Sequence, residues 1–311
     1  MNPAFSVIIF TTVAGAAQGL VVALALAVLG GIDLGTALLS DALLVAAAML
    51  AVGLGASFLH LGRPERAWRA AMMWRTSWLS REVIVLPTFI GIVALWWLAL
   101  RVGSPQACTD LLLPLAAIAV AALLWYCTAM IYACLRFIEE WAHPLTLVNF
   151  VLSGLSSGLL LACALGVFAG ADDLVRAAGP AALAATLFGW VARLVALRRN
   201  ASIRHRSTLQ SATGIHSPNL VQKSMGMSAG SFNTREFFHR ASLAGLKRVR
   251  LALVVFGYAL PALLSAWALA THALWPWWCA VLVQAPGLVA DRWFFFAQAK
   301  HPQNLYYQVV S

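Results

Sequence analysis

Long apolar runs separated by shorter polar stretches dominate the pattern along this chain. A helix needs roughly 20 apolar residues to cross the hydrocarbon core of a bilayer, whereas a barrel strand needs only about ten and alternates in polarity. The length of the runs therefore predicts helices rather than strands. We expect eight membrane spans, at residues 5–29, 36–59, 83–100, 111–135, 146–168, 181–197, 251–271 and 275–296.

The composition agrees with an integral membrane protein. Hydrophobic residues make up 62% of the 311 residues and charged residues only 10%, whereas soluble domains contain roughly 45–50% apolar residues. We expect an all-α bundle of eight transmembrane helices that forms one domain over residues 1–311. Small residues at positions 14–17 and 19 should let the first helix approach a neighbour closely. Pro261 should kink the seventh span.

The charges in the loops predict the orientation of the bundle. Of the 21 lysines and arginines, all except Arg101 and Arg176 fall on the side that holds both termini and the loops after the second, fourth and sixth spans. Positively charged loops remain in the cytoplasm, so we expect both termini to be cytoplasmic. This topology accounts for the net charge of +10, and nucleic-acid binding receives little support.

The loop between the second and third spans, residues 60–82, carries the candidate chemistry. It reads HLGRPERAWRAAMMWRTSWLSRE, with one histidine, five arginines, two glutamates and three tryptophans. Ionisable residues at the edge of a span are costly and by default mark a functional site. His60 closes one span and Glu82 opens the next. We therefore predict that a small redox molecule exchanges protons at this loop.

The chain offers few ligands for a metal cofactor of its own. Its five cysteines form no CxxC pair and no ferredoxin-type run, so they do not predict an iron–sulfur cluster. A haem b quinone oxidoreductase is an alternative class, but it needs facing pairs of histidines inside helices. His272 is the only histidine on the side opposite the termini. We expect no tightly bound cofactor in this chain, haem included.

The loop at residues 198–250 is polar and much longer than the other loops. Loops of this length in compact proteins are usually either functional or disordered. Phe232, Phe237 and Phe238 lie here among basic and amide residues. This mixture favours an ordered cytoplasmic surface for a partner protein over a flexible linker.

The run SFLHLGRPERAWRAAMMWRTSWLSRE, the eight spans and the tail DRWFFFAQAKHPQNLYYQ resemble the membrane-anchor C subunit of the dimethyl sulfoxide reductase family. The resemblance covers essentially the whole chain, and its most specific part is the His-Leu-Gly followed by the glutamate at the head of the third helix. It implies a multi-pass subunit of the bacterial inner membrane that exchanges electrons with ubiquinone or menaquinone. It also implies two partners, a molybdopterin catalytic subunit and a four-cluster iron–sulfur subunit, and the 198–250 loop is the expected docking surface for the latter.

The predicted orientation distinguishes two branches of the family that this chain resembles. Dimethyl sulfoxide reductase places its catalytic subunits, and therefore the side of the 60–82 loop, outside the cytoplasm. The loop charges here predict a cytoplasmic position for that side. We therefore expect the membrane subunit of a sulfite dehydrogenase that reduces quinone. The alternative is the anchor of a dimethyl sulfoxide reductase-type complex that oxidises menaquinol in anaerobic electron transport.

The resemblance also assigns roles within the 60–82 loop. The family's histidine and glutamate, which affect quinol binding and oxidation, correspond to His60 and Glu82. A histidine can hydrogen-bond to a quinone oxygen near neutral pH, and a carboxyl group can give and take the protons. The remaining predicted quinone-binding residues are Gly62, Arg66, Trp68, Trp74, Trp78 and Arg81.

Each of these residues also has a simpler interpretation. Glu82 could form a structural ion pair with Arg81 or Arg75, and His60 could bind a helix end or a lipid headgroup. Interfacial tryptophans often form a belt, and interfacial arginines often anchor the topology. Gly62 could simply end the second helix.

A transporter is the alternative outside the enzymes. Transport predicts ionisable or broken-helix sites near the bilayer midplane. In this chain the charges gather at one interface, and Pro261 is the only prominent helix breaker in the middle of a span. The pattern therefore favours quinone chemistry.

Overall fold

The computed structural model describes residues 1–2, 4–59, 63–223, 239 and 241–306. Within these residues, eight helices are long and apolar enough to cross a membrane, which confirms the expected number. Six of them are single helices: α1 (Phe5–Leu29), α2 (Thr36–Phe58), α3 (Trp78–Arg101), α5 (Pro144–Ala169), α6 (Asp172–Ala201) and α11 (Trp275–Ala297).

Two spans are composite, and the remaining helices are short. The fourth span joins a π-helical turn, η2 (Ala107–Leu112), to α4 (Leu113–Ala133). The seventh joins α9 (Leu243–Val254), a second π-helical turn, η3 (Val255–Ala259), and α10 (Leu260–Thr271). The short elements outside the spans are η1 (Pro64–Met73), α7 (Leu209–Thr213) and η4 (Pro302–Tyr306).

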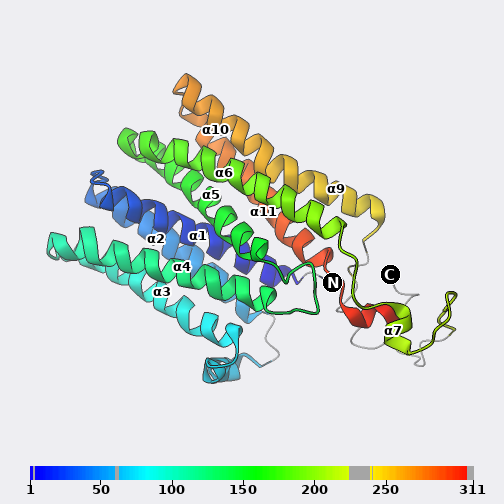
Figure 1. The fold of residues 1–311 in the computed structure, drawn as a ribbon. Coiled ribbons are helices and arrows are strands. Elements are labelled where there is room, and N and C mark those ends of the chain that lie inside the picture. The colour runs from blue at the N-terminus through cyan, green and yellow to red at the C-terminus, as the bar shows by residue number, and fades with distance from the viewer. Residues whose placement is uncertain (3, 60–62, 224–238, 240, 307–311) are drawn as a thin grey trace.

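Figure 1 shows the long helices lying roughly side by side as an elongated bundle, with the N-terminus, α7 and the last described helix, η4, at one end. α1 packs against α2, α4 and α5, so it lies at the centre of the bundle. α3 packs on α2 and α4, whereas α6, α10 and α11 assemble on the other side of α5. The termini share one end, as the even number of spans requires, and the cytoplasmic location of that end stays a prediction.

α1 and α5 touch backbone to backbone. A Cβ atom built on Gly19 would lie 1.9 Å from the carbonyl oxygen of Gly154, and one built on Gly158 would lie 2.0 Å from the carbonyl carbon of Gly19. Only glycine fits such an approach, which is typical of small-residue contacts in membrane bundles. The expected close approach of the first helix is confirmed, and Gly19 is the residue that makes it.

Pro261 lies in the first turn of α10, directly after the π-helical turn η3. Proline lacks an amide donor and clashes with the preceding turn, and a π-helical turn changes the hydrogen-bonding pattern locally. The helix is therefore irregular where the sequence predicts a kink. Pro87, Pro180 and Pro286 also lie inside helices. The expectation that Pro261 is the only prominent helix breaker was wrong.

Candidate functional site

The η1 segment holds three of the predicted quinone-binding residues on its surface or at its end. Trp68 is 63% exposed and Trp74 is 52% exposed. Arg66 is also exposed and lies 3.9 Å from the carboxylate of Glu65. The structure does not bring these three residues to Glu82. The predicted residues His60 and Gly62 lie outside the described residues.

The beginning of α3 is fixed by local hydrogen bonds. Ser77 caps the helix, and its hydroxyl oxygen accepts from the amide of Ser80 at 3.3 Å. Arg81 donates to the carbonyl oxygens of Trp74 at 2.9 Å and Arg75 at 3.0 Å. Its guanidinium carbon also lies 4.0 Å from the centre of the Trp78 ring. Arg81 therefore fastens the preceding loop to the helix.

Glu82 points into the bundle and is only 5% exposed. Its carboxyl group accepts a hydrogen bond from the hydroxyl of Thr128 on α4. Neither Arg75 nor Arg81, both within the described residues, forms an ion pair with it. The alternative of a structural ion pair with these arginines is therefore wrong. A buried carboxyl group without a cation is costly and by default marks a functional position.

Trp78 lies one helical turn before Glu82 and also faces α4. Its ring makes an edge contact with the ring of Tyr126, with centroids 5.2 Å apart. Residues four apart share one face of a helix, so an aromatic pair and a buried carboxyl group lie along the same α3–α4 contact. Of the predicted site residues that the structure describes, it brings together Trp78, Arg81 and Glu82.

A second set of buried charges lies between α6 and α11, and the sequence analysis missed it. Arg193 forms an ion pair with Asp291, and both side chains are almost fully buried. Arg292 is also buried, donates to the hydroxyl of Ser153 at 2.6 Å, and lies 3.8 Å over the ring of Phe150. The assignment of Arg193 and Arg292 to the loop charges was wrong. The Asp-Arg pair inside the apolar eighth span was the available signal.

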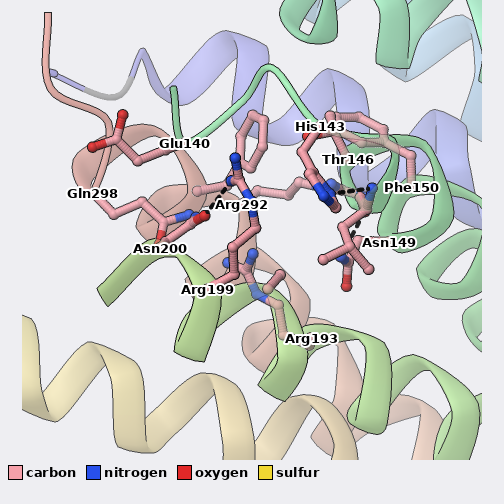
Figure 2. A pocket seen from close by; sticks show the side chains of 13 residues that line it. Glu140, His143, Thr146, Asn149, Phe150, Arg193, Arg199, Asn200, Arg292 and Gln298 are labelled. Atoms are coloured by element: carbon pink, nitrogen blue, oxygen red, sulfur yellow. Dashed lines mark hydrogen bonds between the residues drawn. The ribbon is translucent and has the colours of Figure 1, made fainter. Parts of the chain in front are cut away.

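A narrow polar pocket lies between α5, α6 and α11, near the beginning of α5 and the ends of α6 and α11. Figure 2 shows Arg193, Arg199 and Arg292 directed into it from α6 and α11, opposite side chains of α5 and the loop before it. We call it the outer pocket because it is nearer to the exposed loops. Its polar lining consists of Glu140, His143, Thr146, Asn149, Arg193, Arg199, Asn200, Arg292 and Gln298.

His143 caps α5 beside this pocket. Burial lowers the pKa of His143, and the nearby Arg199 lowers the pKa further. A neutral imidazole has a free ring nitrogen that can accept a hydrogen bond. Accordingly, Nδ1 of His143 accepts from the amide of Leu145 at 3.1 Å. The histidine therefore caps the helix.

A second pocket, which we call the inner pocket, lies among α1, α4, α5 and α11. Its polar lining comes from Thr11, Gln18, Trp125, Thr128 and Arg292. Two residues, Phe150 and Arg292, line both the outer and the inner pocket. Thr128 lines the inner pocket and donates to Glu82. The candidate site at Glu82 is thus one hydroxyl group away from the inner pocket.

A third pocket lies at the opposite end of the bundle, between the α1–α2 connection and η2. Its two acidic residues are Asp33 and Asp110, and no lysine or arginine lines it. Asp33 accepts from the amide of Gly35 at 2.9 Å, and Asp110 accepts from the hydroxyl of Thr109 at 2.8 Å. These local bonds are typical of turns.

A protein-bound metal ion would need several ligating side chains in one place. Within the part of the chain that the structure describes, no three or more His, Cys, Asp and Glu side chains group closely enough to hold a metal ion.

The fold and the site define a multi-pass helical membrane protein with ionisable groups buried toward one end of its bundle. Residues 1–268 match the family model for the DMSO reductase anchor subunit (DmsC), and the chain belongs to this family. This confirms the resemblance noted in the sequence. The protein is thus a membrane anchor subunit of a dimethyl sulfoxide reductase-type oxidoreductase complex.

Two curated relatives narrow the comparison. The chain is 45% identical to the C subunit of sulfite dehydrogenase from Allochromatium vinosum, over the full length of both proteins. It is 32% identical to the anaerobic dimethyl sulfoxide reductase chain YnfH of Escherichia coli, over 38% of this chain and 41% of that protein.

Proposed function

We propose that this subunit passes electrons between a partner iron–sulfur subunit and the membrane quinone pool, and that Glu82 exchanges the accompanying protons. The observation that carries the proposal is the buried carboxyl group of Glu82, which bonds to Thr128 and has no cation partner among the described residues. It lies at the start of α3, directly after the interfacial η1 segment. A proton carrier for a lipid-soluble substrate needs this position between water and the bilayer.

Quinone reduction requires chiefly that the reacting groups are correctly placed. Reduction of a quinone consumes two electrons and two protons, so the site must place a proton donor and a hydrogen-bond partner near the ring oxygens. Glu82 is the proposed proton donor, and the Trp78–Tyr126 contact is the proposed aromatic wall. We retain His60 as the proposed hydrogen-bond partner in the adjoining loop, together with Gly62. For Arg66, Trp68 and Trp74, exposure favours anchoring at the membrane surface.

The long loop is the proposed docking surface for the iron–sulfur subunit. Its described beginning is fastened to the α4–α5 connection: the amide of Arg206 donates to the carboxylate of Glu139 at 2.8 Å, and Arg199 donates to the carbonyl oxygen of Glu139 at 3.1 Å. A capping box at Thr208 and Ser211 starts α7. These contacts support an ordered surface. The predicted aromatic residues Phe232, Phe237 and Phe238 lie outside the described residues.

We further propose that the complex is a sulfite dehydrogenase whose catalytic subunit faces the cytoplasm and whose electrons reduce quinone. The full-length relative named as a sulfite dehydrogenase subunit supports this choice, as does the basic character of the loops at the terminal end. The alternative remains the anchor of a menaquinol-oxidising dimethyl sulfoxide reductase-type complex.

Glu82→Gln in the assembled complex tests the proton role. Glutamine keeps the size and part of the hydrogen bonding but cannot give a proton, so sulfite-to-quinone turnover should fall by roughly 100-fold, the lower end of typical general-acid contributions. Sulfite oxidation with an artificial dye, which bypasses the membrane subunit, should be unchanged. His60→Ala should weaken a quinone-analogue inhibitor by roughly fivefold, the equivalent of about 1 kcal/mol for one hydrogen bond.

Glu65→Gln is the matched control, because Glu65 is an exposed glutamate of the same loop. It should leave both activities at the level of the unmodified complex. Normal quinone turnover in Glu82→Gln would contradict the proposal. A proportional loss of dye activity would show instead that Glu82 maintains the assembly, and the proposal would also be wrong.

A further inference from the structure

The outer and inner pockets are lined by buried polar atoms that have no hydrogen-bond partner among the described residues. Gln18 and Trp125 contribute such atoms to the inner pocket, and Glu140, Asn149 and Gln298 contribute them to the outer pocket. Gln18 is 3% exposed, Trp125 5%, and Glu140 and Asn149 are each 6% exposed. Buried polar groups are nearly always paired, with ordered water where no protein group is within reach. The two pockets are therefore suited to water.

The size of the pockets and their common lining residues agree with this interpretation. Each is narrow, with space for about one water-sized sphere, and a water held by several polar groups needs no more. Phe150 and Arg292 line both pockets, so these two side chains form the boundary between the two spaces. The bond from Arg292 to Ser153 and its stacking over Phe150 fix that boundary.

Each end of this space reaches an acidic group. At the inner end, Thr128 lines the pocket and donates to Glu82. At the outer end, Glu140 lines the pocket, and its other carboxylate oxygen lies 3.6 Å from Nε2 of His205, whose side chain is 28% exposed. A route of polar groups thus leads from the partly exposed His205 to the buried Glu82.

We propose that water in the two pockets carries protons from Glu140, at the end of the bundle where the N-terminus lies, to Glu82. This water thereby supplies the protons that quinone reduction consumes. The inference rests on the proposed function of Glu82. Glu140 and Thr128 are relay residues in this scheme, because they pass protons to Glu82 and do not contact the quinone.

In the direction of quinone reduction, each proton that Glu82 gives to the quinone is replaced by one from water. When Glu82 gives a proton to a quinone oxygen, Thr128 passes its hydroxyl proton to Glu82 and takes one from pocket water. Glu140 returns a proton to that water and regains one from bulk water through His205. Two such transfers accompany the two electrons that the reduced iron–sulfur subunit supplies, and one quinone becomes one quinol.

Arg292 controls when a proton can move along this route. A fixed positive charge beside a narrow water path opposes an excess proton, and Arg292 forms no ion pair with a described residue. Arg292 lines the same inner pocket as Thr128, the hydroxyl donor to Glu82, so the two charges act on the same region of the bundle. Once Glu82 has lost its proton, its negative charge offsets Arg292. Proton transfer toward Glu82 is therefore favoured once Glu82 has lost its own proton.

Glu140→Gln in the full complex tests the relay. Glutamine fits the same space but cannot carry a proton, so sulfite-to-quinone turnover should fall roughly tenfold, less than for the proton donor itself. Dye-linked activity should stay constant, and a small permeant acid such as formic acid should restore part of the quinone turnover. A purely structural role would not respond to the added acid.

Glu65→Gln serves again as the matched control, since Glu65 is an exposed glutamate that lines neither pocket. It should behave like the unmodified complex. Normal turnover in Glu140→Gln together with impaired Glu82→Gln would overturn the relay and leave the proposed function standing. Loss of dye activity in Glu140→Gln, or no response to the acid, would also overturn the relay.

Radiolytic hydroxyl labelling in heavy-oxygen water tests the water independently of quinone turnover. Phe150 and Phe89 are both buried phenylalanines, at 3% and 0% exposure, but only Phe150 lines the pockets. Phe150 should be labelled several times faster than Phe89. Equal, slow labelling would overturn the water route even if Glu82→Gln is inactive with quinone.

Discussion

The backbone contact between α1 and α5 leaves no space for a side chain at Gly19, so Gly19→Ala should force these helices apart. A Cβ atom there would lie 1.9 Å from the carbonyl oxygen of Gly154 and 3.1 Å from the Cα atom of Gly158. Carbon–oxygen contacts across helix interfaces are roughly 3.3 Å, so the carbonyl group would have to move by about 1.4 Å. Main-chain atoms inside a helix cannot rotate away as a flexible side chain can.

The expected cost follows from two opposing effects. Overpacking a well-packed interior typically costs about 1–3 kcal/mol, and the upper half of this range applies because backbone opposes backbone. Alanine in a helix contributes about 0.5–1 kcal/mol of stability relative to glycine. The net destabilisation should therefore be about 1–2.5 kcal/mol. Gly15→Ala is the matched control, one turn earlier on α1, because a Cβ atom there meets nothing within 4 Å.

The assay is the amount of monodisperse protein that remains after heating the detergent-purified complex, followed by fluorescence-detected size exclusion. Gly19→Ala should lower the midpoint of this curve by several degrees, whereas Gly15→Ala should leave it equal or slightly higher. Equal midpoints for the two variants would refute the close approach of α1 and α5.

Two further predictions concern buried charge and orientation. Asp291→Asn removes the partner of Arg193 beside the positive Arg292, so it should destabilise the bundle by about 3–5 kcal/mol in the same assay, and Arg193→Met combined with Asp291→Leu should recover much of that loss. A double variant as unstable as Asp291→Asn would contradict the ion pair as the cause. Reporter fusions after Ser311 and within the 198–250 loop should both report the cytoplasm, because most of the basic loop residues lie on that side. A periplasmic report from either fusion would reverse the orientation and favour the dimethyl sulfoxide reductase-type alternative.

The number and order of the spans could be predicted from the sequence, because transfer into a bilayer depends on the composition of each run of roughly 20 residues. The residues at which the helices begin were less predictable from the sequence. α6 begins at Asp172 and the seventh span at Leu243, whereas the apolar runs begin at residues 181 and 251. A helix can continue through the polar headgroup region, where acidic residues at its N-terminus are favourable.

Glu82 could be predicted as a candidate from the sequence for the same local reason, since a carboxyl group at the head of an apolar run is costly wherever it lies. Its partner could not be identified. Thr128 lies 46 positions further along the chain, and only the packing of α3 against α4 places it beside Glu82. Tertiary structure therefore decided that a hydroxyl group, and neither Arg75 nor Arg81, bonds to this carboxyl group.

The positions of the Arg193 and Arg292 side chains could not be predicted from the sequence around them. Near the end of a span, an arginine can extend to the headgroups or point into the bundle, and the sequence of its own helix does not distinguish the two. The rotation of α6 and α11 about their axes, which packing against α5 sets, turned both arginines inward, toward Asp291 and Ser153. The sequence determined that eight helices enter the bilayer, because that depends on the apolar content of each run alone. Tertiary structure determined which polar groups meet inside the bundle, because that depends on the positions of several helices at once.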